Sequence, residues 1–284
     1  MAPVARLRSL LFAPAVRPDF LRRLPERGAD GVVIDCEDAT PPNAKAEARE
    51  NARALAPELA AAGASVFVRV NAVASEWFEA DVREALCPEL AGIIVPKLDR
   101  TEQLREATAL LAAHRLELPI LAGLETALGV ADARELLAHP SVFAAYFGAE
   151  DFIADMGGVR TESSQEVLYA RSRVALAGRL AGVLTLDQVV TDFRNDALFR
   201  REVEEARAIG YRGKLCIHPT QVVLANEGFV PSAEEVDFAR RLLAAYDAAS
   251  ARGLAAIDFE GQMVDEPLAA RARQTLAAAE ETHE

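Results

Sequence analysis

The chain has 284 residues, enough for one large domain, and 51% of them are hydrophobic, enough for a large core. A net charge of −13 would repel a polyanion, so we expect no nucleic-acid partner, and the apolar runs are too short to span a bilayer, so we expect no membrane association. The same charge opposes an anionic small substrate, so its site must provide its own cations or a metal ion.

The three cysteines are Cys36, Cys87 and Cys216. They are widely separated, odd in number and form no Cys-x-x-Cys pair, which argues against a disulfide framework and against a zinc site. Cys36 and Cys216 lie in apolar runs, and we interpret them as buried hydrophobic residues. This cysteine usage is typical of a reducing compartment, so we expect the protein to be cytoplasmic.

Short apolar runs alternate with longer amphipathic segments, which is typical of β/α units around a parallel sheet. Strands are predicted at residues 8–13, 31–35, 65–71, 92–97, 119–125, 142–148, 183–188 and 214–218. Helices are predicted between them at residues 44–62, 101–115, 127–138, 163–181 and 199–209. Eight such units favour a closed barrel over an open sheet, so the predicted fold class is α/β, a (β/α)8 TIM barrel.

Beyond the eighth predicted strand the chain departs from the repeating unit. A helix is predicted near residues 233–251, followed by a short apolar segment at 253–259 and a helical tail at 268–284. We interpret residues 1–284 as a single TIM-barrel domain in which residues 253–284 form a C-terminal helical extension.

Polar residues follow most of the predicted strands, at the ends where active sites of such barrels gather. They are Asp35, Glu37, Asp38, Arg69, Asn71, Lys97, Glu125, Glu150, Asp151, Asp187, Gln188 and His218. Carboxylates that converge repel one another unless a cation lies between them, and oxygen ligands without a His or Cys cluster suit Mg²⁺ or Mn²⁺. We therefore predict Glu125 and Asp151, on adjacent strands, as the metal ligands.

Two cations of this set are candidates for binding an anionic substrate. Arg69 ends a strand, and its planar fork matches a carboxylate. The alternative for Arg69 is a structural salt bridge to Glu37 or Asp38, and Lys97 has the same two interpretations. His218 could act as a general base, or it could form a structural hydrogen bond at the corner before Pro219.

Seven segments stand in register with the predicted strands and extend over nearly the whole chain. They are residues 8–14 with Arg17-Pro18, 35–39, 68–71, 123–127 with Gly129-Val130, 148–151 with Gly157-Gly158, 216–219 with Gln221, and 261–265. Together they resemble the HpcH/HpaI aldolase/citrate lyase family, specifically its citrate lyase β-subunit-like branch. One departure is the first loop, Pro14-Ala15-Val16-Arg17-Pro18, where the family usually has Gly after the first Pro.

The resemblance implies a Mg²⁺ held by Glu125 and Asp151 and a substrate carboxylate held by Arg69. It implies that the turn Gly148-Ala149-Glu150-Asp151 offers backbone N–H groups to the same keto acid. It also implies a homotrimer in which Asp265 reaches the active site of a neighbouring subunit and moves the proton. Arg17 and Lys97 complete the predicted substrate-binding set, and Arg69 and Asp265 are the predicted catalytic residues.

The predicted activity is that of a Mg²⁺-dependent carbon–carbon lyase. It would cleave a citryl thioester, on coenzyme A or on an acyl carrier protein, to oxaloacetate and an acetyl thioester. The alternatives are a malyl-CoA or citramalyl-CoA lyase and a malate-synthase-like thioesterase. An alternative of another class is a non-catalytic subunit that assembles a larger lyase complex. The related pyruvate aldolases carry an early catalytic His, whereas this chain has Glu37 and Asp38 at that place, which argues against that branch.

Overall fold

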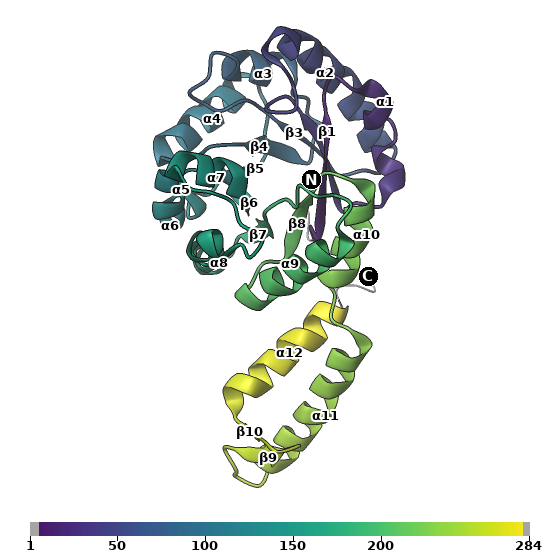
Figure 1. Cartoon of the computed structure of the whole chain (residues 1–284), viewed down its shortest axis with the longest axis vertical. Helices are drawn as coiled ribbons and strands as arrows, with labels where there is room; N and C mark the ends of the chain where they lie inside the picture. Colours follow the sequence, from purple (N-terminus) through teal and green to yellow (C-terminus); the bar gives the residue numbers. More distant parts are fainter. Residues whose placement is uncertain (1–5, 281–284) are drawn as a thin grey trace. The chain divides into compact units, whose positions relative to one another are not determined.

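Eight parallel strands close into a barrel in chain order, with β8 hydrogen-bonded back to β1, in a computed structural model that describes residues 6–280 (Figure 1). They are β1 (Ser9–Pro14), β2 (Gly31–Asp35), β3 (Val66–Arg69), β4 (Gly92–Val95), β5 (Ile120–Leu124), β6 (Val142–Phe147), β7 (Leu184–Asp187) and β8 (Gly213–Cys216). Each overlaps its predicted strand, with ends that differ by two residues or fewer. The predicted TIM barrel is confirmed.

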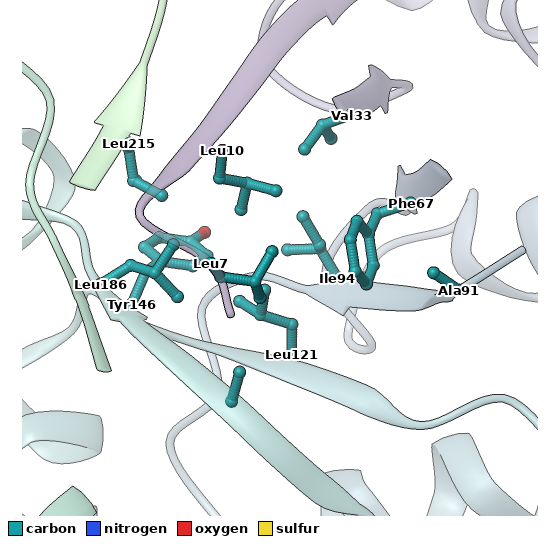
Figure 2. Packing of buried hydrophobic residues seen from close by; sticks show 11 residues of the cluster. Leu7, Leu10, Val33, Phe67, Ala91, Ile94, Leu121, Tyr146, Leu186 and Leu215 are labelled. Atoms are coloured by element: carbon teal, nitrogen blue, oxygen red, sulfur yellow. The ribbon is translucent and has the colours of Figure 1, made fainter. Parts of the chain in front are cut away.

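The strands form because their apolar runs are buried on both faces, one toward the barrel interior and one toward the helices. Since side chains alternate along a strand, every second residue points inward. Figure 2 labels ten residues of the hydrophobic cluster inside the barrel, including Val33 on β2, Phe67 on β3 and Tyr146 on β6. Inward positions nearer the carboxyl ends of the strands therefore continue from this apolar layer into the barrel mouth.

Helices lie outside the strands (Figure 1). They are α1 (Pro18–Leu21), α2 (Lys45–Ala61), α3 (Phe78–Glu84), α4 (Thr101–Ala113), α5 (Ala127–Ala131), α6 (Ala133–Leu137), α7 (Ala149–Met156), α8 (Leu168–Ala181), α9 (Asp196–Ile209) and α10 (Pro219–Gly228). The helix predicted at 127–138 is interrupted at Asp132, whose backbone ψ of 14° is far from helical values. The helix predicted at 163–181 begins instead as a 3₁₀ turn, Gln165–Val167.

Asp187, at the end of β7, faces the helices and not the barrel mouth. Its carboxylate accepts two hydrogen bonds from Arg171 of α8, at 3.0 and 2.9 Å, and one from Lys214 of β8, at 2.7 Å. Lys214 also donates to Glu202 of α9, at 3.0 Å, and all four side chains are buried. Paired in this way the charges can remain buried, so Asp187 belongs to a structural network that joins α8 and α9 to the strands.

The chain divides into two compact units between Asn226 and Glu227. The second unit contains α11 (Ala233–Ser250), the hairpin β9 (Ile257–Phe259) and β10 (Gln262–Val264), and α12 (Glu266–Glu280). Its own apolar core includes Leu242, Tyr246 and Val264. The predicted helical tail is confirmed through Glu280, and its last residues, 281–284, lie outside the described part of the chain. The interpretation of one domain with an extension from residue 253 stays a prediction.

Among residues 6–280, no helix is both long enough and apolar enough to cross a membrane.

Candidate active site

The polar layer at the carboxyl end of the barrel follows from strand alternation. Val33 and Phe67 point inward, so Asp35 and Arg69, two residues further along β2 and β3, point inward as well. On β5 the same alternation leads from Leu121 to position 125. Glu125 lies just beyond the strand and is buried, with 2% of its surface exposed. Several of the predicted site residues therefore meet above the apolar core.

Glu125 is a buried carboxylate with two hydrogen bonds, both to the same oxygen. Its Oε1 accepts from the backbone N–H of Lys97 and from the Tyr146 hydroxyl, each at 2.9 Å. Burial, reinforced by the negative charge of Glu37, raises the pKa of Glu125 to about 7. A nearby cation would favour its ionised form, so this carboxylate is prepared to bind a positive ion.

Gly148 provides the space that Glu125 occupies. A Cβ at this position would lie 2.3 Å from Glu125 Oε2, closer than atoms can pack. The backbone N–H of Gly148 donates to the carbonyl of Leu124, at 3.1 Å, so it continues the sheet pairing and is not offered to a ligand. The next N–H groups, in the first turn of α7, have no acceptor within the helix because an α-helix leaves its first N–H groups unpaired. Those of Ala149, Glu150 and Asp151 therefore suit the predicted anion contact.

Lys97 joins the carboxylates around the mouth. Its Nζ lies 2.7 Å from Glu37, 3.3 Å from Asp38 and 3.6 Å from Asp151. Burial alone would lower the pKa of Lys97, but the hydrogen bond to Glu37 and the surrounding carboxylates raise it. Its backbone has a φ of 53°, an unfavourable conformation for a residue with a side chain, and this conformation directs its N–H at Glu125.

Arg69 is held by two carboxylates. Its Nε and Nη2 donate to the two oxygens of Asp35, at 2.7 and 2.6 Å, and its Nη1 lies 3.0 Å from Glu37 Oε2, without hydrogen-bond alignment. The guanidinium carbon also lies 5.1 Å from the centre of the Phe12 ring. The proposed salt bridge to Glu37 is therefore present, Asp38 contacts Lys97 instead, and Asp35 is a partner that we did not anticipate. The predicted contact of Arg69 with a substrate carboxylate stays a prediction.

Two predicted substrate-binding residues have partners of their own. Arg17 pairs with Asp19, at 2.7 Å, and lies over the exposed Phe20 ring. Glu150 pairs with Arg160 beyond α7, at 2.9 Å. The substrate contacts of Arg17 and Glu150 stay predictions.

Asp265 and His218 are the remaining candidates for proton transfer. Asp265 lies in the second unit, between β10 and α12, and its buried Oδ1 has no hydrogen-bond partner among residues 6–280. His218 is hydrogen-bonded to Thr220, at 2.9 Å, and its ring stacks on Phe193, with 5.0 Å between the ring centres. These contacts favour the structural interpretation of His218 over the general base.

Tyr146 and Lys45 are site residues that the sequence analysis missed. The Tyr146 hydroxyl is a single polar group at an inward position of an otherwise apolar strand. This placement is the feature of the sequence that could have identified Tyr146 as a site residue. Burial raises the pKa of its hydroxyl, as does the Glu125 carboxylate, so the hydroxyl remains a hydrogen-bond donor. Lys45 donates to the carbonyls of Cys36 and Glu37, each at 2.8 Å, and so fixes the loop after β2. No sequence motif marks Lys45.

The donor chemistry fits a magnesium site of the usual kind. Glu125 and Asp151 offer carboxylate oxygens, the ligands that Mg²⁺ prefers. Within residues 6–280, no three His, Cys, Asp or Glu side chains are arranged to hold a metal ion together. A Mg²⁺ at this place would have to complete its ligand shell with substrate and water oxygens, which is how Mg²⁺ is commonly bound.

The family model of HpcH/HpaI aldolase/citrate lyase matches residues 8–219, the barrel with its mouth. The chain belongs to this family. The match ends before the second unit, so it does not extend to Asp265.

Three members show how far the similarity extends. A citrate lyase subunit beta-like protein of Deinococcus radiodurans is 53% identical over 280 residues, covering 97% of this chain and 98% of that one. A mitochondrial citramalyl-CoA lyase of Mus musculus is 30% identical over 289 residues, covering 96% and 86%. The solved structure of protein CitE from Mycobacterium tuberculosis, in complex with magnesium, acetoacetate and coenzyme A, has a TM-score of 0.83 and 31% identity, covering 98% and 99%. The predicted resemblance to the citrate lyase β-subunit-like branch is confirmed.

Proposed function

We propose that the protein is a Mg²⁺-dependent carbon–carbon lyase that cleaves citryl thioester to oxaloacetate and an acetyl thioester. The observation that carries the proposal is the buried Glu125 carboxylate in a barrel of the citrate lyase family. It accepts a hydrogen bond from the backbone of Lys97, whose side chain lies 3.6 Å from Asp151, and the charges of Asp151 and Arg69 act on its pKa. The similarity to protein CitE bound to magnesium, acetoacetate and coenzyme A supports both the metal and the class of substrate.

Glu125 and Asp151 would hold the Mg²⁺, with Mn²⁺ as a possible substitute. Bound Mg²⁺ supplies positive charge that stabilises negative charge on the substrate oxygens. Gly148 leaves the space beside Glu125 Oε2 free of a side chain, and the first N–H groups of α7 can donate to a keto acid carboxylate.

The other residues orient the substrate and move a proton. Arg69, already held by Asp35 and Glu37, would bind the carboxylate of the substrate, and Lys97 would balance the negative charge around it. Asp265 of a neighbouring subunit in a homotrimer would accept the proton of the substrate hydroxyl. The O–H electron pair then forms the new C=O bond of oxaloacetate. The C–C bond pair passes to the thioester as an enolate, which takes up a proton to give the acetyl thioester.

The runner-up reactions use the same residues. The 30% identity to a citramalyl-CoA lyase supports a lyase that acts on a citramalyl or malyl thioester. A thioesterase would result if the base activated water against the thioester carbonyl. The three cysteines are buried with free thiols, which supports the proposal of a reducing, cytoplasmic compartment.

A panel of thioesters tests the proposed function. The purified protein with Mg²⁺ is expected to release a keto acid from citryl-CoA faster than from malyl-CoA or citramalyl-CoA, and EDTA is expected to stop the reaction. Oxaloacetate, glyoxylate and pyruvate are measured as the respective products. Release of free thiol without any keto acid would indicate a thioesterase. Binding of oxaloacetate without turnover of any thioester would support a carrier-protein substrate or an assembly subunit.

Mixed oligomers test the placement of Asp265. Glu125→Gln and Asp265→Asn are each expected to be inactive alone. If each site combines the barrel of one subunit with Asp265 of the next, subunits co-expressed in equal amounts should regain about a quarter of the wild-type activity, because that fraction of sites receives both intact residues. If Asp265 serves the barrel of its own chain, the mixture will stay as inactive as its components. The mass of the oligomer in solution checks the trimer independently.

A further inference from the structure

The two hydrogen bonds to Glu125 divide the roles of its two oxygens. Oε1 accepts from both Tyr146 and the Lys97 backbone, so its two lone pairs in the carboxylate plane are used. Oε2 lies over Gly148, where a Cβ is absent. Glu125 can therefore bind a metal ion through Oε2, and not through both of its oxygens.

We propose that Tyr146 is a positioning residue that fixes the Glu125 carboxylate so that it presents Oε2, and only Oε2, to the metal ion. This inference rests on the proposed function and adds to it a residue outside the predicted ligand set. Tyr146 would not touch the metal or the substrate. It acts by preventing Glu125 from rotating into a pose in which both oxygens compete for the cation.

The Tyr146 side chain is enclosed by the barrel interior, and its hydroxyl packs against Gly123. Its ring is packed in the barrel interior, and 1% of the residue is exposed. Gly123 is its partner in the pairing of β5 with β6, and a Cβ on Gly123 would lie 2.6 Å from the Tyr146 hydroxyl oxygen. Gly123 therefore leaves room for the Tyr146 hydroxyl. A buried Phe at position 146 has no hydroxyl and would not need this space.

The segment just beyond β4 contributes the other hydrogen bond to Glu125 Oε1, through the backbone of Lys97. Its N–H donates to Oε1 at 2.9 Å from a residue that adopts a φ of 53° just beyond β4. A donor from β6 and a donor just beyond β4 thus meet on one oxygen of Glu125, just beyond β5. A hydroxyl that merely avoided being unpaired in the core would not require this convergence.

The test is the affinity of Tyr146→Phe for Mn²⁺, measured by isothermal titration and by the EPR signal of free Mn²⁺ at one pH. We expect the dissociation constant to rise about 10- to 100-fold, as is typical when a group that orients a metal ligand is removed. In turnover with the best thioester of the panel, high Mn²⁺ should restore most of the kcat. Gly123→Ala keeps the hydroxyl but displaces it, and should weaken Mn²⁺ binding in the same direction.

Tyr211→Phe is the matched control. Its hydroxyl is also buried and donates to a backbone carbonyl, that of Arg171, at 3.0 Å, but it lies before β8 at the opposite end of the strands. This variant should lose thermal stability and keep the wild-type Mn²⁺ affinity. If Tyr146→Phe behaves like Tyr211→Phe while Glu125→Gln no longer binds Mn²⁺, the positioning role is wrong and the proposed function stands. If Glu125→Gln binds Mn²⁺ as wild type does, both fail.

Discussion

Replacing Glu125 with Gln is expected to abolish metal-dependent turnover and, at the same time, to make the metal-free protein more stable near pH 8. The loss of turnover follows from removing a charged metal ligand, and we expect a decrease of about 10³-fold or more. The gain in stability follows from the pKa of Glu125. An unfolded chain ionises a glutamate near its ordinary value of 4.5, whereas burial raises the pKa in the folded protein to about 7.

The sign of the pH effect is set by which state binds more protons. Between the two pKa values the folded protein binds the extra proton, so its stability falls as the pH rises through this interval and stays reduced above it. The raised pKa of Glu125 corresponds to a loss of about 3 kcal/mol in the free energy of unfolding above the folded-state pKa. Gln keeps the shape and both hydrogen bonds, but they become weaker because the acceptor is neutral. The net gain near pH 8 should therefore be about 1–2 kcal/mol.

Thermal melting in EDTA, at acidic pH and near pH 8, checks this expectation. The melting temperature of Glu125→Gln should exceed that of the wild type by about 2–5 °C near pH 8, and the difference should vanish below the ordinary pKa of a glutamate. Glu106→Gln, an exposed residue on α4, makes the same chemical change without the burial and should melt as the wild type does at both values. A Glu125→Gln protein that is less stable near pH 8 would show that Glu125 is ionised and well compensated in the folded state.

Replacing Gly148 with Ala is expected to have the second largest effect, lowering both the stability of the protein and its affinity for Mn²⁺. The backbone of Gly148, with a φ of −103°, suits any residue, so the effect arises from space alone. The new Cβ would meet Glu125 Oε2 at 2.3 Å, and Glu125 cannot withdraw because Tyr146 and Lys97 hold its other oxygen. Overpacking of this kind destabilises by about 1–3 kcal/mol. The displaced carboxylate should also bind Mn²⁺ about 10- to 100-fold more weakly.

Gly158→Ala is the control for this substitution. Its Cβ would lie 3.4 Å from Ile153, an ordinary contact, in a segment just beyond the same helix. We expect wild-type Mn²⁺ affinity and nearly wild-type melting for Gly158→Ala. Equal Mn²⁺ affinities for the two alanine variants would mean that Oε2 of Glu125 does not face the metal.

The strands were predictable because each is a short apolar run buried on two faces, and this pattern is local in sequence. The positions of Glu125 and Lys97 followed from the same runs, since each is the last residue of a predicted strand. The pairing of Arg69 with Asp35 was not predictable, because it depends on which residues of adjacent strands point inward at the same height. Asp187 was assigned to the mouth by its place at a strand end, and strand alternation turns it toward the helices instead.

Tyr146 shows where the sequence has least to say. In the apolar run of β6 its ring reads as core, which is correct, and only the fold shows that the hydroxyl reaches a carboxylate on the next strand. The left-handed backbone of Lys97 is equally hidden, because a lysine does not favour that conformation by itself. Both depend on contacts between strands, which a single sequence does not display.

The pairing of β8 with β1 has a consequence for the order of events during synthesis. Glu125 and the groups that contact it lie between residues 97 and 148, so the ribosome releases them well before Gly213–Cys216, the strand that closes the barrel. Until then the layer of Leu7, Leu186 and Leu215 beneath Tyr146 is incomplete, and water can reach the carboxylates of Glu37 and Glu125. The penalty for burying these carboxylates thus falls on the final closure, and we expect the nascent chain to acquire its metal site among its last native features.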